Sequence, residues 1–204
     1  MQFLIDIGGT LWKNSLMDNL TEIIKGRRSI RKFLDKPIPK EAVDQLIEAA
    51  KWAPSGMNHQ PWGFIVVQDK TLIKELSDHS IPHIKKLIET NPKLRRYKRR
   101  MAVDNFSIFY HAACVIIIVG KIDSFSCDQD CAMAAQNLML KAYSLDIGSC
   151  WIGMMSVLDK DEWFRQRFDL PDTYKIIAPI ALGYFEDKDI PIIERVEPGV
   201  LKYF

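Results

Sequence analysis

Three arginines and a serine lie within the short segment Arg27–Arg31, directly after a predicted helix. Guanidinium groups match phosphate oxygens in paired hydrogen bonds, and the hydroxyl of Ser29 adds a donor. In an extended segment, the side chains at positions 27, 29 and 31 point in the same direction. The pattern is therefore typical of an anion clamp for a nucleotide phosphate. A solvated basic turn is the alternative, because short charge runs are usually solvated.

A second polar segment, residues 53–62, contains Pro54, Ser55, Asn58 and Pro61 and precedes an apolar stretch. An asparagine amide carries both a donor and an acceptor, so it can pair with the edge of a heterocyclic ring. The two prolines stiffen the loop, which favours preorganised recognition. The loop is therefore a candidate binding element. The alternative is a purely structural turn, followed by Trp62 packed in the hydrophobic core.

The third candidate is the segment Gly148–Gly153, in which two glycines bracket the apolar run around Cys150, Trp151 and Ile152. Glycine lets a backbone approach a flat ligand closely, and backbone amides there could donate to a cofactor ring. A glycine-bounded buried strand is the alternative. Cys150 has the chemistry of a nucleophile, but no histidine lies close in sequence to activate it, so a structural thiol is favoured.

Hydrophobic periodicity and turn residues predict the elements that position these segments. Two prolines, Pro82 and Pro92, suggest that residues 70–110 form short exposed helices. Asp159 is a candidate N-cap. The pattern lacks regular βαβ alternation, which favours an α+β fold with a central sheet flanked by helices. We expect helices ending at Gly26 and over residues 39–51, 128–145 and 159–168, and strands over 62–68, 112–120, 147–152 and 176–184, with 112–120 buried on both faces.

The composition limits the class of protein. The 204 residues carry a net charge of +2, too small to indicate binding to nucleic acid or a membrane. No apolar run is long enough to span a bilayer. The four cysteines suit a reduced, cytoplasmic protein, and the Cys127–Cys131 pair lacks the further ligands of a metal site. We expect one domain over residues 17–204, preceded at 1–16 by an extension or leader, a pairing strand or a tail.

The three segments, in this order, resemble the nitroreductase family. The resemblance rests on R-R-S-x-R-x-F from Arg27, P-S-x-x-N-x-Q-P-W from Pro54 and a Trp-Ile-Gly segment ending at Gly153. It continues in an alanine-rich helix over residues 132–142 and in the final A-L-G-Y strand, residues 181–184. Each motif is weak alone, but the ordered set is fairly specific and covers roughly residues 17–204. The segment directly before Gly153 reads Cys-Trp-Ile and contains no acidic residue, and residues 70–110 match no pattern of the family.

The resemblance implies an α+β fold with a mixed, largely antiparallel sheet, and a homodimer with flavin mononucleotide (FMN) at its interface. The first segment would contact the FMN phosphate, with Arg31 near the pyrimidine edge of the flavin. Asn58 would pair with that edge, and the backbone up to Gly153 would pass the reactive face. The cofactor-binding residues that the resemblance implies are Arg27, Arg28, Ser29, Arg31, Pro54, Ser55, Asn58, Cys150, Trp151, Ile152, Gly153 and, more loosely, Arg195.

The implied activity is a ping-pong hydride transfer from NADH or NADPH, through FMN, to a small-molecule acceptor such as a nitroaromatic, a quinone or another conjugated compound. It needs no catalytic side chain and no metal. Relatives that consume flavin or dehalogenate reductively are one alternative, and a non-catalytic flavin- or nucleotide-binding dimer is another. The basic run at residues 95–100 could attract the phosphates of NAD(P)H or nucleic acid, but a solvated helix face is favoured.

Overall fold

The computed structural model describes residues 19–186, 190, 194–196, 199 and 202–204, so the expectation for residues 1–16 lies outside it. A four-stranded sheet forms the centre of the described chain, in the order β1-β2-β4-β3. All three strand pairs are antiparallel. The predicted α+β class with a largely antiparallel sheet is confirmed. The strands are β1 (Trp62–Val67), β2 (Cys114–Lys121), β4 (Tyr174–Gly183) and β3 (Gly148–Trp151).

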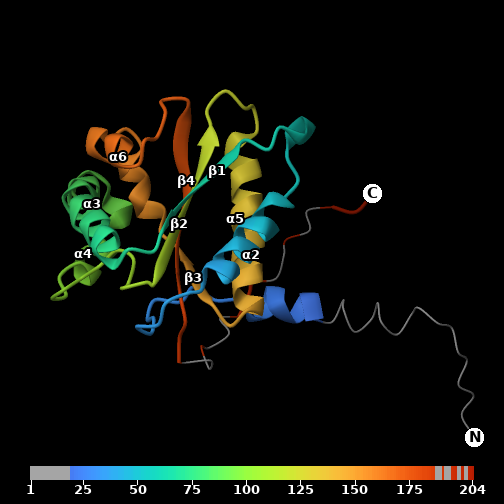
Figure 1. Ribbon diagram of the computed structural model, residues 1–204, viewed down its shortest axis with the longest axis horizontal. Coiled ribbons are helices and arrows are strands. Elements are labelled where there is room, and N and C mark those ends of the chain that lie inside the picture. The colour runs from blue at the N-terminus through green and yellow to red at the C-terminus, as the bar shows by residue number, and fades with distance from the viewer. Residues whose placement is uncertain (1–18, 187–189, 191–193, 197–198, 200–201) are drawn as a thin grey trace, which may run out of the picture.

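Helices cover both faces of the sheet, which gives three layers (Figure 1). Strand β2 is buried from Cys114 to Gly120, as its run of β-branched residues predicts. Because successive side chains of a strand point to opposite faces, Ile116 and Ile118 belong to one core cluster and Ile117 to the other. The sheet thus separates two hydrophobic cores.

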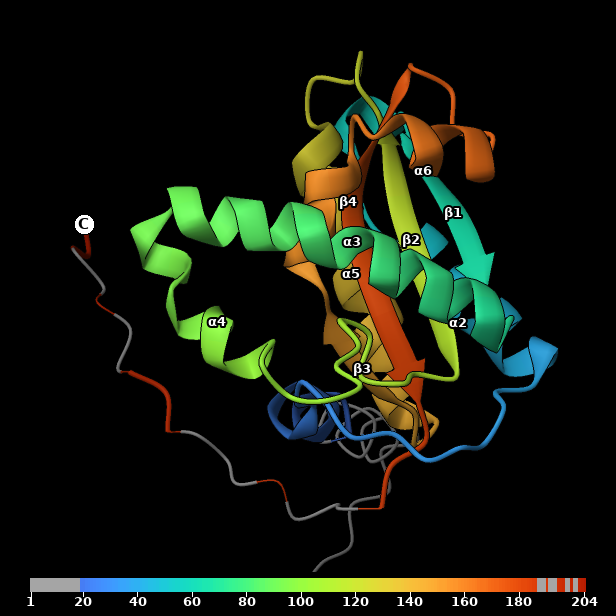
Figure 2. The same ribbon diagram turned by 90° about the vertical axis from the view of Figure 1, so that its left-hand side faces the viewer.

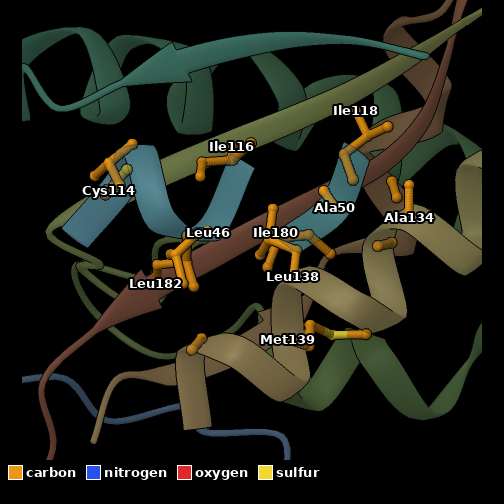
Figure 3. Close-up of a cluster of buried hydrophobic side chains, with 14 of the residues drawn as sticks. Leu46, Ala50, Cys114, Ile116, Ile118, Ala134, Leu138, Met139, Ile180 and Leu182 are labelled. Atoms are coloured by element: carbon orange, nitrogen blue, oxygen red, sulfur yellow. The ribbon is translucent and has the colours of Figure 1, made fainter. Parts of the chain in front are cut away.

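Helices α2 (Lys40–Lys51) and α5 (Cys127–Ser144) pack side by side against one face. The apolar stripe of α2 buries Leu46 and Ala50, and α5 meets it with small residues and Leu138 (Figure 3). Complete burial of one leucine side chain contributes about 1.5–3 kcal/mol. This face therefore anchors α5, which carries Asp130 beside the polar loop and Tyr143 beside Gly26.

The other face carries α3 (Lys70–Thr90), the 3-10 helix η3 (Gly153–Leu158) and α6 (Glu162–Arg167). From the end of α3, the chain continues through η2 (Pro92–Leu94) into α4 (Arg96–Arg100), which Figure 2 shows projecting beyond the sheet. No helix in the described part of the chain is both long and apolar enough to cross a bilayer.

The prediction of short helices was wrong for residues 70–90, because α3 runs through Pro82 without a break. An interior proline costs a helix about 3 kcal/mol. The same helix buries four large apolar side chains, each contributing about 1.5–3 kcal/mol, so packing outweighs the cost of the proline. These side chains are Ile73, Leu76, Ile84 and Ile88.

The prediction that Asp159 caps a helix was also wrong. Helix α6 begins at Glu162, and its cap is Asp161, whose carboxylate accepts a hydrogen bond from the Phe164 amide. Asp159 instead accepts a hydrogen bond from the backbone amide of Ile176 at 2.6 Å. The carboxylate of Asp159 therefore ties the chain before α6 to strand β4.

Candidate functional site

The arginine segment lies along the outer edge of β3. Ser29 and Ser149 form an isolated parallel bridge, and the amide of Ile30 donates to the carbonyl of Ser149 at 2.9 Å. A little further along, the amide of Leu34 donates to the carbonyl of Tyr184 at 2.8 Å. The structure thus brings together the first and third candidate segments, which are more than a hundred residues apart in sequence.

Two paired glycines make this contact possible. Gly148 and Gly183 face each other across β3 and β4. A Cβ atom on Gly148 would lie 2.7 Å from the side chain of Ile30, and one on Gly183 would lie 2.7 Å from Phe33. The expectation that both bracketing glycines admit a ligand was therefore wrong for Gly148, which admits Ile30. A Cβ on Gly153 would meet nothing nearer than 4.0 Å, so that backbone stays accessible.

Positive charge gathers at the start of the segment. Partial burial, helped by the nearby charges of Arg28 and Arg195, lowers the pKa of Arg27. The structure therefore places Arg195 of the C-terminal tail within electrostatic range of Arg27, and its role at a phosphate stays a prediction. Because like charges repel when no anion separates them, this cluster favours an anionic ligand.

Three buried polar atoms at this edge have no hydrogen-bond partner among the described residues. They are the Nε atoms of Arg27 and Arg28 and the hydroxyl of Ser149. Another nitrogen of Arg28 is held by the carbonyls of Lys25 and Arg27, so its guanidinium is oriented by the backbone. Unsatisfied buried donors are rare in folded proteins, and a bound phosphate would provide acceptors for them.

Burial raises the pKa of the Cys150 thiol, although the nearby guanidinium groups of Arg31 and Arg100 oppose the shift. Cys150 is also almost completely buried, at 2% exposure. A thiol of this kind is poorly nucleophilic at neutral pH, because the thiolate is the reactive form. The sequence interpretation of Cys150 as a structural thiol agrees with this environment.

We expect Cys150 of the native protein to remain unmodified by iodoacetamide at pH 7. Its raised pKa keeps the thiolate population below that of an ordinary cysteine, and its burial denies access to the reagent. Peptide mass spectrometry after a timed exposure reads out the modification. Alkylation of Cys150 at the rate of a free thiol would contradict the assignment.

A cavity of about 300 Å³ opens beside the Cys150–Gly153 backbone. One wall comes from α3, α4 and the following residues, which sequence reasoning did not connect with the site. Arg100 belongs to the basic run that was interpreted as a solvated helix face, and Lys98, Arg99 and Arg100 are all exposed, as that interpretation predicts. Arg100 also lines the cavity. The lining residues that the sequence missed include Leu87, Tyr97, Arg100, Phe106, Tyr110 and Met154.

Hydrogen bonds hold the polar loop over residues 54–58 in a defined conformation. The buried carboxylate of Asp130, near the start of α5, accepts hydrogen bonds from the Gly56 amide at 3.2 and 3.3 Å and from the Ser126 hydroxyl at 2.9 Å. Ser55 accepts from the amide of Gln60, whose side chain in turn donates to Asn58. The loop is thus held in one shape, while the side chain of Asn58 is exposed.

This loop does not share a site with the arginines of the same chain. It precedes Trp62, which pairs with Gly120 at one end of β2, whereas Gly148 and Gly183 lie level with the other end. The six residue steps along β2 from Gly120 to Cys114 separate the two ends by about 20 Å. Along α5, Asp130 holds the loop while Tyr143 contacts Gly26, again about 20 Å apart. The polar loop and the arginine segment, which the resemblance assigns to one cofactor site, therefore lie at opposite ends of the sheet within a single chain.

We expect Asp130→Ala to destabilise the protein by about 1–3 kcal/mol, the cost of leaving hydrogen-bonding groups unsatisfied at a buried position. The amide of Gly56 and the hydroxyl of Ser126 would lose their shared acceptor. Urea unfolding measures the change. Asp123→Ala, at the turn before α5, is the matched control and should change stability little; an equal loss in both variants would contradict the role of Asp130.

Comparisons with known proteins fit this arrangement. The sequence model described as "Nitroreductase family" matches residues 24–184. The chain belongs to the nitroreductase family. A crystal structure of a nitroreductase with bound FMN from Bacteroides fragilis has a TM-score of 0.77 and 27% identity, covering 91% of this chain and 98% of that one. The resemblance drawn from the three motifs is confirmed.

Two curated relatives of the family differ in their named activities. A protein of Methanothermobacter thermautotrophicus, provisionally named NADH dehydrogenase/NAD(P)H nitroreductase, is 33% identical over 172 residues, or 84% of this chain and 80% of that protein. An iodotyrosine deiodinase of Nematostella vectensis is 33% identical over 192 residues, or 84% of this chain and 69% of the deiodinase. Membership of the family therefore leaves the acceptor open.

Proposed function

We propose that this protein is an oxidoreductase that holds FMN as its resident cofactor and transfers electrons from NADH or NADPH to small conjugated acceptors. One observation carries the proposal: the unsatisfied donors of Arg27, Arg28 and Ser149 lie at the outer edge of β3, the strand that leads into the accessible backbone at Gly153. The FMN bound to the Bacteroides fragilis relative supports the choice of cofactor.

The residues present suit the chemical groups of FMN. Arg27, Arg28, Ser29 and Arg195 would hold the phosphate, and Arg31 would lie at the pyrimidine edge. The backbone from Cys150 to Gly153, including Trp151 and Ile152, would face the ring. Pro54, Ser55 and Asn58 would come from a second copy of the chain, because their loop lies about 20 Å from the arginines of its own chain. When bound, FMN supplies the capacity to accept and donate a hydride.

The protein itself contributes binding, orientation and charge. The guanidinium groups of Arg31 and Arg100 both line the cavity, where positive charge stabilises negative charge that develops during reduction. The apolar and aromatic wall of the cavity excludes water from the face of the bound ring system. No side chain is assigned as an acid or base, because hydride transfer requires neither.

The cavity favours an aromatic acceptor that carries a negative charge. Its wall combines Tyr97, Phe106 and Tyr110 with the guanidinium of Arg100, which lies 5.8 Å from the centre of the Tyr97 ring. Aromatic walls stack on flat substrates, and an arginine at the rim pairs with a carboxylate. Nitroaromatic acids and charged quinones fit this description within the broader set of nitroaromatic, quinone and other conjugated acceptors.

We therefore expect Arg100→Gln to raise the KM for 4-nitrobenzoate about fivefold, the effect of losing an exposed charge pair worth about 1 kcal/mol. The KM for uncharged nitrobenzene should stay nearly constant. Steady-state kinetics at fixed NADH or NADPH measures both values. An equal change for the two acceptors would contradict a role in recognising charge.

Initial-rate kinetics also tests whether reductant and acceptor use the same cavity in turn. A ping-pong scheme predicts parallel double-reciprocal lines when the concentrations of NAD(P)H and acceptor are varied together. Intersecting lines would require both molecules to be bound at once and would contradict the shared cavity. The cavity is lined by the backbone from Cys150 to Gly153 that would face the flavin, so reductant and acceptor would reach the same face of the ring in turn.

A dehalogenase is the second candidate, and the deiodinase relative specifically favours it. Reduction of 3-iodotyrosine or a halophenol with release of halide, without reduction of nitroaromatics, would establish that alternative. Consumption of the flavin itself would identify a flavin-degrading relative instead. A protein that binds FMN, yet transfers electrons to neither class of acceptor, would be the non-catalytic dimer.

A further inference from the structure

Two histidines and a carboxylate meet where α3 packs near α6 (Figure 2), and none of the three lines the cavity described above. His79 and His83 lie one turn apart on α3, and Asp161 caps α6. The Nε2 atom of His79 lies 2.9 Å from one carboxylate oxygen of Asp161, and the Nε2 atom of His83 lies 3.5 Å from the other. The proposed flavin chemistry uses none of these side chains.

The spacing of these atoms suits a transition-metal ion. One ligand atom from each residue lies within 4.8 Å of the other two. In a tetrahedral zinc site with bonds of about 2.0–2.1 Å, neighbouring ligand atoms are about 3.3 Å apart. The two nitrogen–oxygen distances, each to a different oxygen of Asp161, lie on either side of this value, so binding of an ion would require the side chains to rotate toward it. Three protein ligands would leave a fourth position for water.

Neighbouring residues hold the ligands in position, as outer-shell partners do in metal sites. Asp161 also accepts a hydrogen bond from the Phe164 amide at 2.9 Å. The ring of His79 stacks on Trp163 with a centroid distance of 4.1 Å.

The cluster is also accessible to an ion from solvent. The side chain of His83 is 42% exposed and that of His79 is 29% exposed, whereas Asp161 is 13% exposed. Imidazole and carboxylate ligands together suit borderline ions such as Zn²⁺ and Ni²⁺ better than Mg²⁺ or Ca²⁺, which prefer oxygen ligands throughout. The chemical class of ligand is therefore a divalent transition metal.

We propose that His79, His83 and Asp161 bind one divalent transition-metal ion, which fastens α3 to α6. The alternative is an ordinary ion pair in which protonated histidines contact Asp161 without a metal. His83 lies one helical turn before Leu87, which lines the cavity. The metal thus supports the helix that forms one wall of the candidate active site, and it takes no part in electron transfer.

Isothermal titration of the flavin-loaded, chelator-treated protein with zinc chloride tests the site. We expect one ion per chain and a Kd that rises at least about 10- to 100-fold in His83→Gln and Asp161→Asn, the loss that even an outer-shell substitution causes. Asparagine remains a good N-cap, so Asp161→Asn should stay folded. His59→Gln, in the polar loop and outside the cluster, is the control for metal affinity and should leave it unchanged.

Thermal unfolding supplies a second readout that is independent of activity. Zinc should raise the Tm of the unsubstituted protein and of His59→Gln, because a ligand that binds only the folded state stabilises it. It should leave the Tm of His83→Gln nearly unchanged. Failure of the unsubstituted protein to take up zinc, or zinc binding that survives in both ligand variants, would overturn the proposal.

Discussion

Arg27→Ala is expected to fold but to lose its affinity for FMN. A hydrogen bond to a charged group contributes about 1.5–3 kcal/mol, so removing the Arg27 guanidinium should raise the Kd for FMN at least about tenfold. The Nε atom of Arg27 has no hydrogen-bond partner among the described residues, so the substitution removes no hydrogen bond of that atom from the free protein. Fluorescence titration of the flavin-free protein with FMN measures the change in Kd.

The same substitution should leave the flavin-free protein at least as stable as before. Burial and the charges of Arg28 and Arg195 lower the pKa of Arg27, which means that its charged form is disfavoured in the absence of an anion. Arg167→Ala is the matched control, because Arg167 is half exposed and its ion-pair partner among the described residues is Glu75 at 3.8 Å. Unchanged FMN affinity in Arg27→Ala, or an equal loss in Arg167→Ala, would contradict the anion clamp.

A mixed dimer should recover a site that neither parent retains. In one chain Arg27→Ala removes the clamp, and in the other Asn58→Gly removes the loop amide. Asn58 has a φ of 57°, which glycine adopts without strain. If the loop serves the FMN of the partner subunit, one of the two sites in the mixed dimer keeps both an intact Arg27 and an intact Asn58. That dimer should hold about half the flavin of the unsubstituted protein.

Two different affinity tags allow the mixed dimer to be isolated and its flavin content compared with both parent dimers. A double variant with both substitutions in one chain, paired with an unsubstituted chain, is the matched control, because each of its sites would lack one of the two side chains. Flavin retained by the double-variant pair but not by the mixed dimer would contradict the assignment and show that each chain completes its own site.

Much of this arrangement could be predicted from local sequence. The β-branched run in β2 predicted a strand buried on both faces, and the stripe of α2 predicted its contact with the sheet. The first and third motifs proved to be neighbours because Ile30 and Phe33 fit against Gly148 and Gly183. That contact depends on strand pairing between distant residues, which a local pattern does not contain.

The errors have the same physical origin. Pro82 was expected to end a helix, but buried isoleucines further along α3 outweigh its local cost. Arg100 and Tyr97 could not be assigned to the cavity, because only the path of the chain after α3 brings them beside Cys150. The loop at Asn58 lies about 20 Å from the arginines of its own chain, so its place beside them in a dimer stays a prediction.

The central claim is that this protein holds a flavin that a nicotinamide nucleotide can reduce. The most direct test is the visible spectrum of the purified protein, followed by addition of NADH or NADPH in the absence of oxygen. The account predicts the absorbance bands of a bound flavin, released as FMN on denaturation, and bleaching of those bands by at least one of the two nucleotides. A colourless protein that fails to take up added FMN, or bound FMN that neither nucleotide reduces, would contradict it.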